Sequence, residues 1–568
     1  MRSLSRFFRA IRALNPVRAA RHWYFRLKNW RRGRAKIDYI TFIIPSQLPV
    51  LPQPRDWLRK RLLGPAPLSI IELDRIFERI GADPRPKGVI LHLRGFAMPL
   101  ADLQTVRASI KRLREQGKRV ICFTQSCTLS TYYVASAADE IVLMPGGELD
   151  TVGLRAEAVF LKDALDQVGV RLDSIAISPF KGAFDSYTRS EMSEEGRAQL
   201  NWLLDSQFDM LVRGIAEGRR LSPDAVRTLI DDAPHLDNDA LAAGYVDAVQ
   251  TEEDLHRRLN SEHILTWSDA DKKVRNIWRK PAEKVIALLT VNGLMVPGES
   301  GAPPVDLPIP FLGGERTGDL TFVQQVRAVM KNKSAAAVVL YIDSGGGSAL
   351  ASEAMTSALL ELAKDRPVVA YMNGVAASGG YYVATPAQWI VAQPGTITGS
   401  IGVIGAKVVT NGLFDRLRIN RVEVTRGANA NFQSDHAPYT DDQRARAFRS
   451  IEHIYQQFIR HVSRSRRLTL EAVDAVGGGR VWTGEQALAH GLVDELGDWR
   501  AALRKARELA NLPDHTPLVW ARGKTKPLPA QLAQSAQPAA VLTYLAENLD
   551  VVASGAPQVI MPFVWTSE

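Results

Sequence analysis

The stretch "YYVATPAQWIVAQPGTITGSIG" (Tyr381–Gly402) has a counterpart far upstream in the same chain, "YYVASAADEIVLMPGGELDTVG" (Tyr132–Gly153). The two stretches are identical at ten of 22 positions. A constant offset of 249 residues, with no gap, aligns residues 88–182 with residues 337–431. Self-similarity over this length is the signature of a duplicated structural unit. We therefore predict a tandem duplication, whose halves are called the first repeat and the second repeat.

Short apolar runs alternate with helical patterns in both repeats. The first repeat has the β-rich runs "VILHL", "RVICFT" and "EIVLM", and "LADLQTVRASIKRLREQG" between them carries apolar residues at helical spacing. The second repeat has "VIALLTV", "AVVLYI", "PVVAYM" and "WIVAQ". This alternation predicts crossover connections, mainly parallel strands and hence an α/β fold. A polar joint is expected near residues 265–284, and the Gly/Pro-rich segment Pro297–Gly318 is expected to be a lid or an ordinary surface loop.

Composition places the chain among ordinary globular proteins. Its 568 residues are too many for one core, and 46% of them are apolar and 23% charged. The two cysteines, Cys122 and Cys127, are too few for a disulfide framework or a cysteine metal site. The sequence implies no metal or organic cofactor.

Positive charge is concentrated at the amino-terminal end. The net charge is +10, and residues 1–36 hold twelve Arg or Lys and no acid. Apolar residues recur there at helical spacing, and Trp23, Tyr24 and Trp30 alternate with arginines. Such an arm suits an anionic membrane surface, so peripheral attachment to the cell membrane is expected, with the side left open. A disordered arm, or one packed on a neighbouring subunit, is the alternative.

Other roles for this arm are disfavoured. No nucleic-acid partner is expected, because no recognised nucleic-acid motif follows the arm. Arginine interrupts every candidate signal-peptide core, and no window of about 18 apolar residues exists to form a spanning helix.

The two repeats differ where chemistry would be carried out. Ser378 of the second repeat aligns with Leu129, whereas Lys181 of the first repeat aligns with Ala430. The second repeat also has "DSGGGS" after a strand, where the first has "RGFAMP". Each repeat thus keeps what the other lacks. Complementary losses of this kind predict a single composite site.

Serine, lysine and glycine have matching uses in acyl transfer. A serine hydroxyl is a weak nucleophile until a base takes its proton. Lysine can be that base only when desolvation lowers its pKa enough to make it neutral. Glycine lets the backbone offer N–H donors to an oxyanion, and we assign one donor to Gly346 or Gly347 and the other to Gly379. Each element alone is more often structural, and it is the complementary placement that favours catalysis.

Together these motifs resemble the signal peptide peptidase A family, in its long tandem-domain form, within the Clp-protease/crotonase superfamily. The segments that carry the resemblance are "DSGGGSALASEAM" (Asp343–Met355), "GVAASGGYYVA" (Gly374–Ala384), "TGSIGVIG" (Thr398–Gly405), "SPFKGAFDSYTR" (Ser178–Arg189) and "GRVWTGEQALAHGLVDELG" (Gly479–Gly497). The similarity covers roughly residues 60–510. The chain departs from the family at Gly345, where proline is common, and in its basic arm, where many relatives have a transmembrane helix.

The resemblance implies a Ser–Lys dyad, with Ser378 as nucleophile, Lys181 as general base and Ser400 orienting the lysine amine. It also implies a homotetramer with an enclosed apolar interior. The implied segments are a basic amphipathic arm (1–36), a Clp/crotonase-like domain with the lysine (37–282), a second such domain with the serine (283–520) and a tail (521–568).

The expected function is a serine endopeptidase that cleaves remnant signal peptides or similar apolar peptides. Two other functions are alternatives. A crotonase-like acyl-CoA enzyme would bind CoA thioesters and would not need Ser378. A non-catalytic membrane scaffold is disfavoured, because a relaxed site should have lost the serine, the lysine or the glycine loop.

Overall fold

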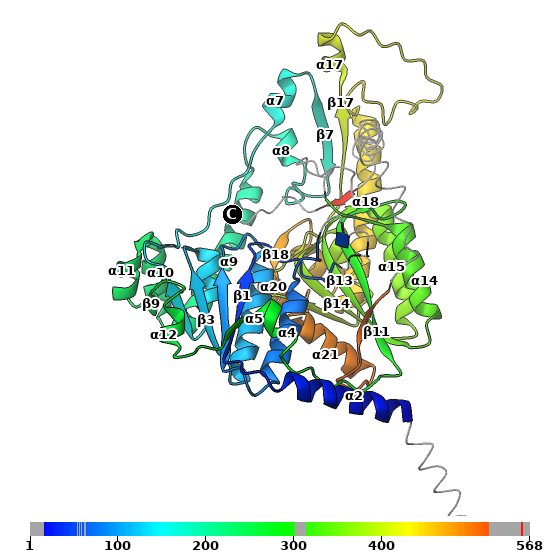
Figure 1. The fold of residues 1–568 in the computed structure, drawn as a ribbon. Coiled ribbons are helices and arrows are strands. Elements are labelled where there is room, and N and C mark those ends of the chain that lie inside the picture. The colour runs from blue at the N-terminus through cyan, green and yellow to red at the C-terminus, as the bar shows by residue number, and fades with distance from the viewer. Residues whose placement is uncertain are drawn as a thin grey trace, which may run out of the picture. The chain divides into compact units, whose positions relative to one another are not determined.

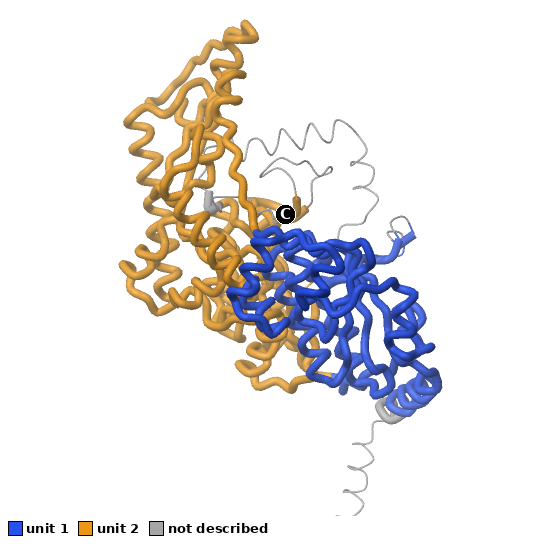
Figure 2. The backbone as a smooth tube through the Cα atoms, turned by 90° about the vertical axis from the view of Figure 1, so that its left-hand side faces the viewer, with its two compact units in different colours: residues 1–153, 211–281, 567–568 blue, residues 154–210, 282–566 orange. Residues whose placement is uncertain are grey.

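The computed structural model describes residues 16–301, 314–521 and 558–560, apart from residues 54, 56, 58, 59, 62 and 63. The chain forms two compact units (Figure 2). Among the described residues, unit 1 contains residues 16–153 and 211–281, and unit 2 contains residues 154–210, 282–521 and 558–560.

This division differs from the predicted domain boundary. Residues 154–210 come from the first repeat but pack within unit 2, so the predicted domain 37–282 is not one compact unit. Lys181 therefore lies in the same unit as Ser378. Sequence alignment reveals where a repeat begins and ends, but not which core its segments join.

The main sheet of unit 1 is entirely parallel. Its strands are, in spatial order, β10 (Ile264–Thr266), β1 (Tyr39–Ile44), β2 (Gly88–Leu93), β3 (Arg119–Thr124), β5 (Glu140–Leu143) and β9 (Ala248–Val249). Every residue of β2 is buried, as expected for a parallel strand covered on both faces.

Unit 2 contains a parallel sheet with the same order. Its strands are β20 (Leu518–Trp520), β11 (Val285–Val296), β13 (Ala335–Ser348), β14 (Val368–Ala377), β15 (Trp389–Ala392) and β19 (Glu495–Leu496). β12 (Arg316–Gly318) adds to the end of β11. The predicted strands and the α/β tandem repeat are thereby confirmed.

Helices also correspond between the repeats. Equivalent pairs are α4 (Ile70–Gly81) and α14 (Asp319–Lys331), α5 (Leu100–Glu115) and α15 (Ala349–Ala363), α6 (Leu129–Ala135) and α16 (Gly379–Tyr382), α7 (Lys162–Gln167) and α17 (Asn411–Arg416), and α9 (Glu194–Arg219) and α18 (Asp441–Arg466). The other helices are α2 (Pro16–Arg32), α8 (Asp185–Thr188), α10 (Pro223–Asp231), α11 (Asp237–Ala242), α12 (Leu255–Arg258), α13 (Trp267–Ala270), α19 (Leu470–Val476), α20 (Gly484–Ala489) and α21 (Trp499–Leu509).

A smaller set of strands lies beyond each main sheet. In unit 1 it is β4 (Cys127–Thr128), β6 (Glu148–Asp150) and β8 (His235–Leu236). In unit 2 the end of β14 pairs with β16 (Ile397–Gly399), which pairs with β18 (Val481–Thr483). These strands place the Ser378 turn beside Ser400.

One strand pair joins the two repeats. β7 (Arg171–Ala176) of the first repeat pairs antiparallel with β17 (Ile404–Val409) of the second, and Figure 1 shows the two side by side. This pair is the physical reason that residues 154–210 join unit 2. It also directs the chain that follows β7 toward the Ser378 turn.

The predicted basic arm is helical where it is described. α2 packs on the segment that follows α13, because Phe25 contacts Trp278 edge-on and the Asn29 side chain hydrogen-bonds the backbone of Asn276. Its Trp23, Tyr24 and Trp30 side chains remain exposed. Among the described helices, none combines the length and the apolar character that a membrane crossing needs. Residues 1–15, most of the predicted 297–318 loop and most of the 521–568 tail lie outside the described residues.

Candidate active site

Ser378 occupies a strained turn between β14 and α16. Its φ of 55° and ψ of −114° are unusual for a residue with a side chain, and such strain concentrates at functional sites. Its N–H donates to the carbonyl of Gly399 at 2.8 Å, which fixes the turn, and the residue is fully buried. The helix that follows is only four residues long, so its dipole contributes little.

Lys181 lies in the loop after β7 and is one of the largest fully buried side chains described. Its Nζ is 2.7 Å from Ser378 Oγ, 2.8 Å from Ser400 Oγ and 2.9 Å from the Ser400 carbonyl oxygen. The structure thus brings together the three side chains that the sequence singled out.

Burial lowers the pKa of Lys181 well below its ordinary value of 10.5. The three oxygens that contact its amine are hydroxyl and carbonyl groups, so none supplies a negative charge to favour the ammonium form. An amine in this setting can be neutral near physiological pH and can therefore accept a proton.

Ser400 is itself held in a specific backbone conformation. Its φ is 50°, and the preceding Gly399 has a φ of 81°. The Ser400 N–H donates to the carbonyl of Arg480 at 2.6 Å. This turn aims both the carbonyl and the hydroxyl of Ser400 at the lysine amine, which is the geometry expected of a residue that orients it.

The predicted glycine donors lie beside the Ser378 turn. A Cβ on Gly379 would lie 3.0 Å from Gly346 Cα and 2.7 Å from Ser352 Oγ, so only glycine permits this close approach. Gly346 and Gly347 both have positive φ, 102° and 153°.

The Gly346 N–H, however, already has an acceptor. It donates to Ser344 Oγ at 3.1 Å, and that hydroxyl donates in turn to the Gly293 carbonyl at 2.6 Å. Gly347 lies within β13, in register with Met295 of β11 and with Val559 of β21, whereas Gly379 lies at the start of α16, outside the sheet.

Sequence reasoning overlooked the glycines that receive the lysine loop. A Cβ on Gly479 would lie 2.7 Å from Lys181 Cα, and one on Gly402 would lie 3.2 Å from Lys181 Cδ. The Ser178 hydroxyl donates to the Gly478 carbonyl. The available signal was the run "GGGR" (Gly477–Arg480).

Aromatic contacts hold the same loop from its other side. Trp202 of α9 stacks on Trp482 of β18, with centroids 5.0 Å apart and planes 14° apart, and its Nε1–H donates to the Val481 carbonyl at 2.8 Å. The Arg480 guanidinium lies 4.1 Å from the centroid of the Phe180 ring. These contacts fix the segments on both sides of Lys181 and so limit its movement relative to Ser378.

A short backbone strand pairs with the glycine loop. β21 (Gln558–Ile560) runs antiparallel to Gly346–Ser348 and is drawn in red in Figure 1. The edge of β13 beyond the end of β14 therefore accepts an extended peptide. Peptide recognition by strand addition uses this kind of edge.

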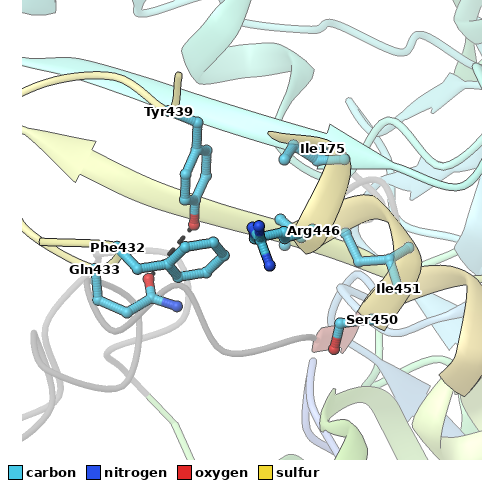
Figure 3. Close-up of a pocket in the computed structure, with 9 residues that line it drawn as sticks. Ile175, Phe432, Gln433, Tyr439, Arg446, Ser450 and Ile451 are labelled. Atoms are coloured by element: carbon cyan, nitrogen blue, oxygen red, sulfur yellow. Dashed lines mark hydrogen bonds between the residues drawn. The ribbon is translucent and has the colours of Figure 1, made fainter. Parts of the chain in front are cut away.

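A separate pocket lies between the β7–β17 pair and α18. Figure 3 shows Tyr439, Phe432 and Arg446 around it, with the Tyr439 hydroxyl 3.4 Å from Gln433 Oε1. Its nine lining residues include none of the predicted site residues. Within the described ranges, no group of three or more His, Cys, Asp or Glu could hold a metal ion.

Known proteins are similar to this chain over much of its length. The family model for peptidase family S49 matches residues 112–266 and 361–513, together more than half of the chain. A chloroplastic serine protease SPPA of Arabidopsis thaliana is 28% identical, over 85% of this chain and 71% of its own length.

Two bacterial proteins show the same similarity. Protease 4 of Haemophilus influenzae is 30% identical, over 78% of this chain and 74% of its own length. A putative signal peptide peptidase SppA of Enterococcus faecium is 27% identical, over 43% of this chain and 69% of its own length.

Proposed function

This chain belongs to peptidase family S49 and is a serine endopeptidase, and we propose that it cuts peptide bonds with a dyad of Ser378 and Lys181. The observation that carries this proposal is the distance of 2.7 Å between Lys181 Nζ and Ser378 Oγ, at a lysine fully removed from water. Nucleophile and base are within hydrogen-bond reach, and burial lowers the pKa of the base.

In the acylation step, Ser378 Oγ attacks the scissile carbonyl carbon while its proton passes to Lys181 Nζ. The carbonyl oxygen becomes an oxyanion, which the N–H of Gly379 and one N–H of the Gly346–Gly347 loop stabilise. The Lys181 ammonium then gives its proton to the leaving nitrogen. The peptide bond breaks, the amine product leaves, and the acyl group remains as an ester on Ser378.

In the deacylation step, the neutral Lys181 takes a proton from water, and the hydroxide attacks the ester carbonyl. Collapse of the second oxyanion releases the carboxylic acid, and the lysine returns the proton to Ser378 Oγ. Ser400 accepts or donates hydrogen bonds at the amine throughout, which keeps Nζ directed at Oγ.

Replacing either dyad residue tests the mechanism. Ser378→Ala and Lys181→Ala should each abolish cleavage of an apolar peptide of about 20 residues, measured by mass spectrometry, while circular dichroism remains that of the wild type. Full activity in either variant would exclude the dyad.

We further propose that the substrates are remnant signal peptides or similar apolar peptides. The glycine-loop edge that pairs with β21 suits an extended chain, and the relative from Enterococcus faecium is named a putative signal peptide peptidase. A polar peptide of equal length serves as the control, because comparable cleavage of both peptides would remove the proposed preference.

Membrane attachment and assembly complete the proposal. α2, with its exposed Trp23, Tyr24 and Trp30, would bind the surface of an anionic cell membrane, and the chain would assemble as a homotetramer. Cosedimentation with phosphatidylglycerol vesicles, but not with phosphatidylcholine vesicles, is the expected result for the helix. The triple variant Trp23→Ala/Tyr24→Ala/Trp30→Ala should no longer cosediment with phosphatidylglycerol vesicles.

A further inference from the structure

The β7–β17 pair shows how one repeat attaches to the next. β7 comes from the first repeat, β17 from the second, and their register places Asp173 opposite Lys407 and Leu172 opposite Val408. Because the repeats are equivalent, each segment of this pair has a counterpart 249 residues away. The counterpart of β17 is residues 155–160, and the counterpart of β7 is residues 420–425.

Among the described residues, neither counterpart pairs with another strand. Both segments are described, and neither belongs to a strand. Val422 and Val424 are 90% and 78% exposed. Figure 1 shows residues 420–425 in the yellow loop that leaves the sheet after α17. Exposed apolar residues in an extended segment call for a partner strand.

We propose that residues 420–425 of one molecule pair antiparallel with residues 155–160 of a second molecule of the same chain. The register carried over from β7–β17 places Ala158 opposite Val422 and Ala156 opposite Val424. The partner is a second copy of this chain because residues 420–425 correspond to β7, and the segment that corresponds to its partner β17 is residues 155–160 of the first repeat.

The side chains of the paired segments alternate as a half-buried sheet requires. One face would carry Ala156, Ala158 and Phe160 against Asn420, Val422 and Val424, so it is apolar except for Asn420. This apolar face would be buried on association.

The other face of the pair would be polar except for Val159, which would lie opposite Arg421. It would place Glu157 opposite Glu423, a like-charge pair that costs stability when uncompensated. Arg155, already ion-paired to Glu157 at 2.7 Å, lies on the same face and supplies the compensating charge. The polar face is therefore tolerated at a solvent-exposed position.

Unit 1 presents a second, independent sign of a missing neighbour. Ile401 in unit 2 is fully buried, whereas its counterpart Val152 in unit 1 is 65% exposed. Thr483 of β18 is buried and hydrogen-bonds Ser206 of the first repeat at 2.9 Å, whereas the equivalent residue of β8, Leu236, is exposed. Thr483, which the first repeat contacts in unit 2, thus has an exposed counterpart in unit 1.

The proposed contact joins two different surfaces and is therefore head-to-tail. Contacts of this type close into rings or continue as filaments. The inference rests on the self-association in the proposed function, for which it supplies the interface, and it is independent of the dyad. A closed ring of four molecules would satisfy both.

Disulfide trapping tests the pairing directly. In the variant Ala158→Cys/Val422→Cys, oxidation should link molecules into species at multiples of the 62.7 kDa chain mass on non-reducing gels. The native Cys122 and Cys127 are both buried and should not interfere. Controls are each single variant and Ala158→Cys/Glu423→Cys, whose second cysteine points to the opposite face. Linking in the double variant alone supports the proposal.

Three results would overturn the pairing: self-linking of the single Val422→Cys variant, equal linking in the off-face control, or no linked species at all. Sedimentation of the wild type separates the causes. If the wild type is an oligomer but no disulfide forms, the chain self-associates through another interface. If the wild type is a 62.7 kDa monomer, both the self-association and this interface are wrong. Peptide cleavage by the same protein reports on the dyad separately.

A substitution that disrupts the surface provides the second measurement. Val422→Asp/Val424→Asp should shift the sedimenting species from the oligomer to the monomer, because charge replaces the apolar face. Leu320→Asp introduces the same charge at an exposed apolar residue elsewhere in the chain. It is the control and should leave the sedimenting mass unchanged. An unchanged mass in the valine variant would contradict the proposal.

Discussion

The same strand-to-helix junction occurs twice in this chain and is built in two ways. In unit 1, α6 begins after Thr128, which has an ordinary extended conformation (φ −66°, ψ 166°) and caps the helix by accepting from the Thr131 N–H. In unit 2, α16 begins after Ser378, whose φ is 55° and whose side chain makes no capping bond to the helix. The side chain is instead 2.7 Å from Lys181 Nζ.

The difference shows what a functional site costs the fold. A capped junction stabilises its helix by about 1 kcal/mol, whereas a non-glycine residue in a sparsely populated conformation costs about 1–3 kcal/mol. Unit 2 retains the costly junction because surrounding contacts hold it, including the hydrogen bond from the Ser378 N–H to Gly399. Unit 1 has the same topology, with Leu129 in place of the serine, and Leu129 does not have a positive φ.

The largest effect is expected when the lysine that contacts Ser378 is replaced. Lys181→Arg keeps a positive charge that cannot be lost in proteins, so the base function disappears. The specificity constant kcat/KM for an apolar peptide should fall by about 100- to 10,000-fold. Ala430→Arg, at the aligned and exposed position of the second repeat, is the control and should retain wild-type kcat/KM. Activity retained in Lys181→Arg would show that another group is the base.

The next largest effect concerns the oxyanion donor. Gly379→Ala forces a Cβ to within 3.0 Å of Gly346 Cα, which displaces the loop and its N–H groups. Turnover, kcat, should fall by about 100- to 1000-fold, the usual cost of losing one donor. Ser130→Ala changes the aligned position of the first repeat and should leave kcat unaltered. Equal losses in both variants would point to misfolding and not to the oxyanion site.

The pH dependence of the free energy of unfolding tests whether the buried lysine is neutral in the folded state. The folded-state pKa of Lys181 lies well below its ordinary value of 10.5, so the unfolded chain binds the extra proton between these two values. Stability of the wild type should therefore rise with pH in this window, by about 1.4 kcal/mol per pH unit at most, relative to Lys181→Met.

Urea unfolding at several pH values measures this difference. Lys333→Met removes an exposed lysine and should follow the wild type across the series. Parallel curves for the wild type and Lys181→Met would mean that the buried lysine keeps its proton in the folded state.

The smallest effect is expected at the conventional junction. Thr128→Ala removes the cap of α6 and should lower the free energy of unfolding by about 1 kcal/mol, measured in urea. Peptide cleavage should be unchanged, because Thr128 belongs to the unit without the dyad. A large loss of activity in this variant would show that the first junction also serves catalysis.

Much of the candidate site could be predicted from aligned differences alone. Ser378 and Lys181 stood out because each is replaced in the other repeat, and the structure places their side chains in contact. Gly479 and Gly402 did not stand out, since a glycine that makes room for a distant backbone looks like any turn glycine until the neighbour is known. The competing bond from Gly346 to Ser344 was equally invisible, because it depends on a hydroxyl's position.

The sequence by itself determined the duplication, the α/β class and the residue types of the site, because apolar periodicity and aligned replacements are local properties of the chain. Only the tertiary structure decided that residues 154–210 belong with the second repeat and that Lys181 is buried against Ser378 and Ser400. Strand pairing between β7 and β17 makes that choice, and it depends on contacts between residues more than 200 positions apart. A lowered lysine pKa follows from that burial, since desolvation is a property of the surroundings and not of the residue.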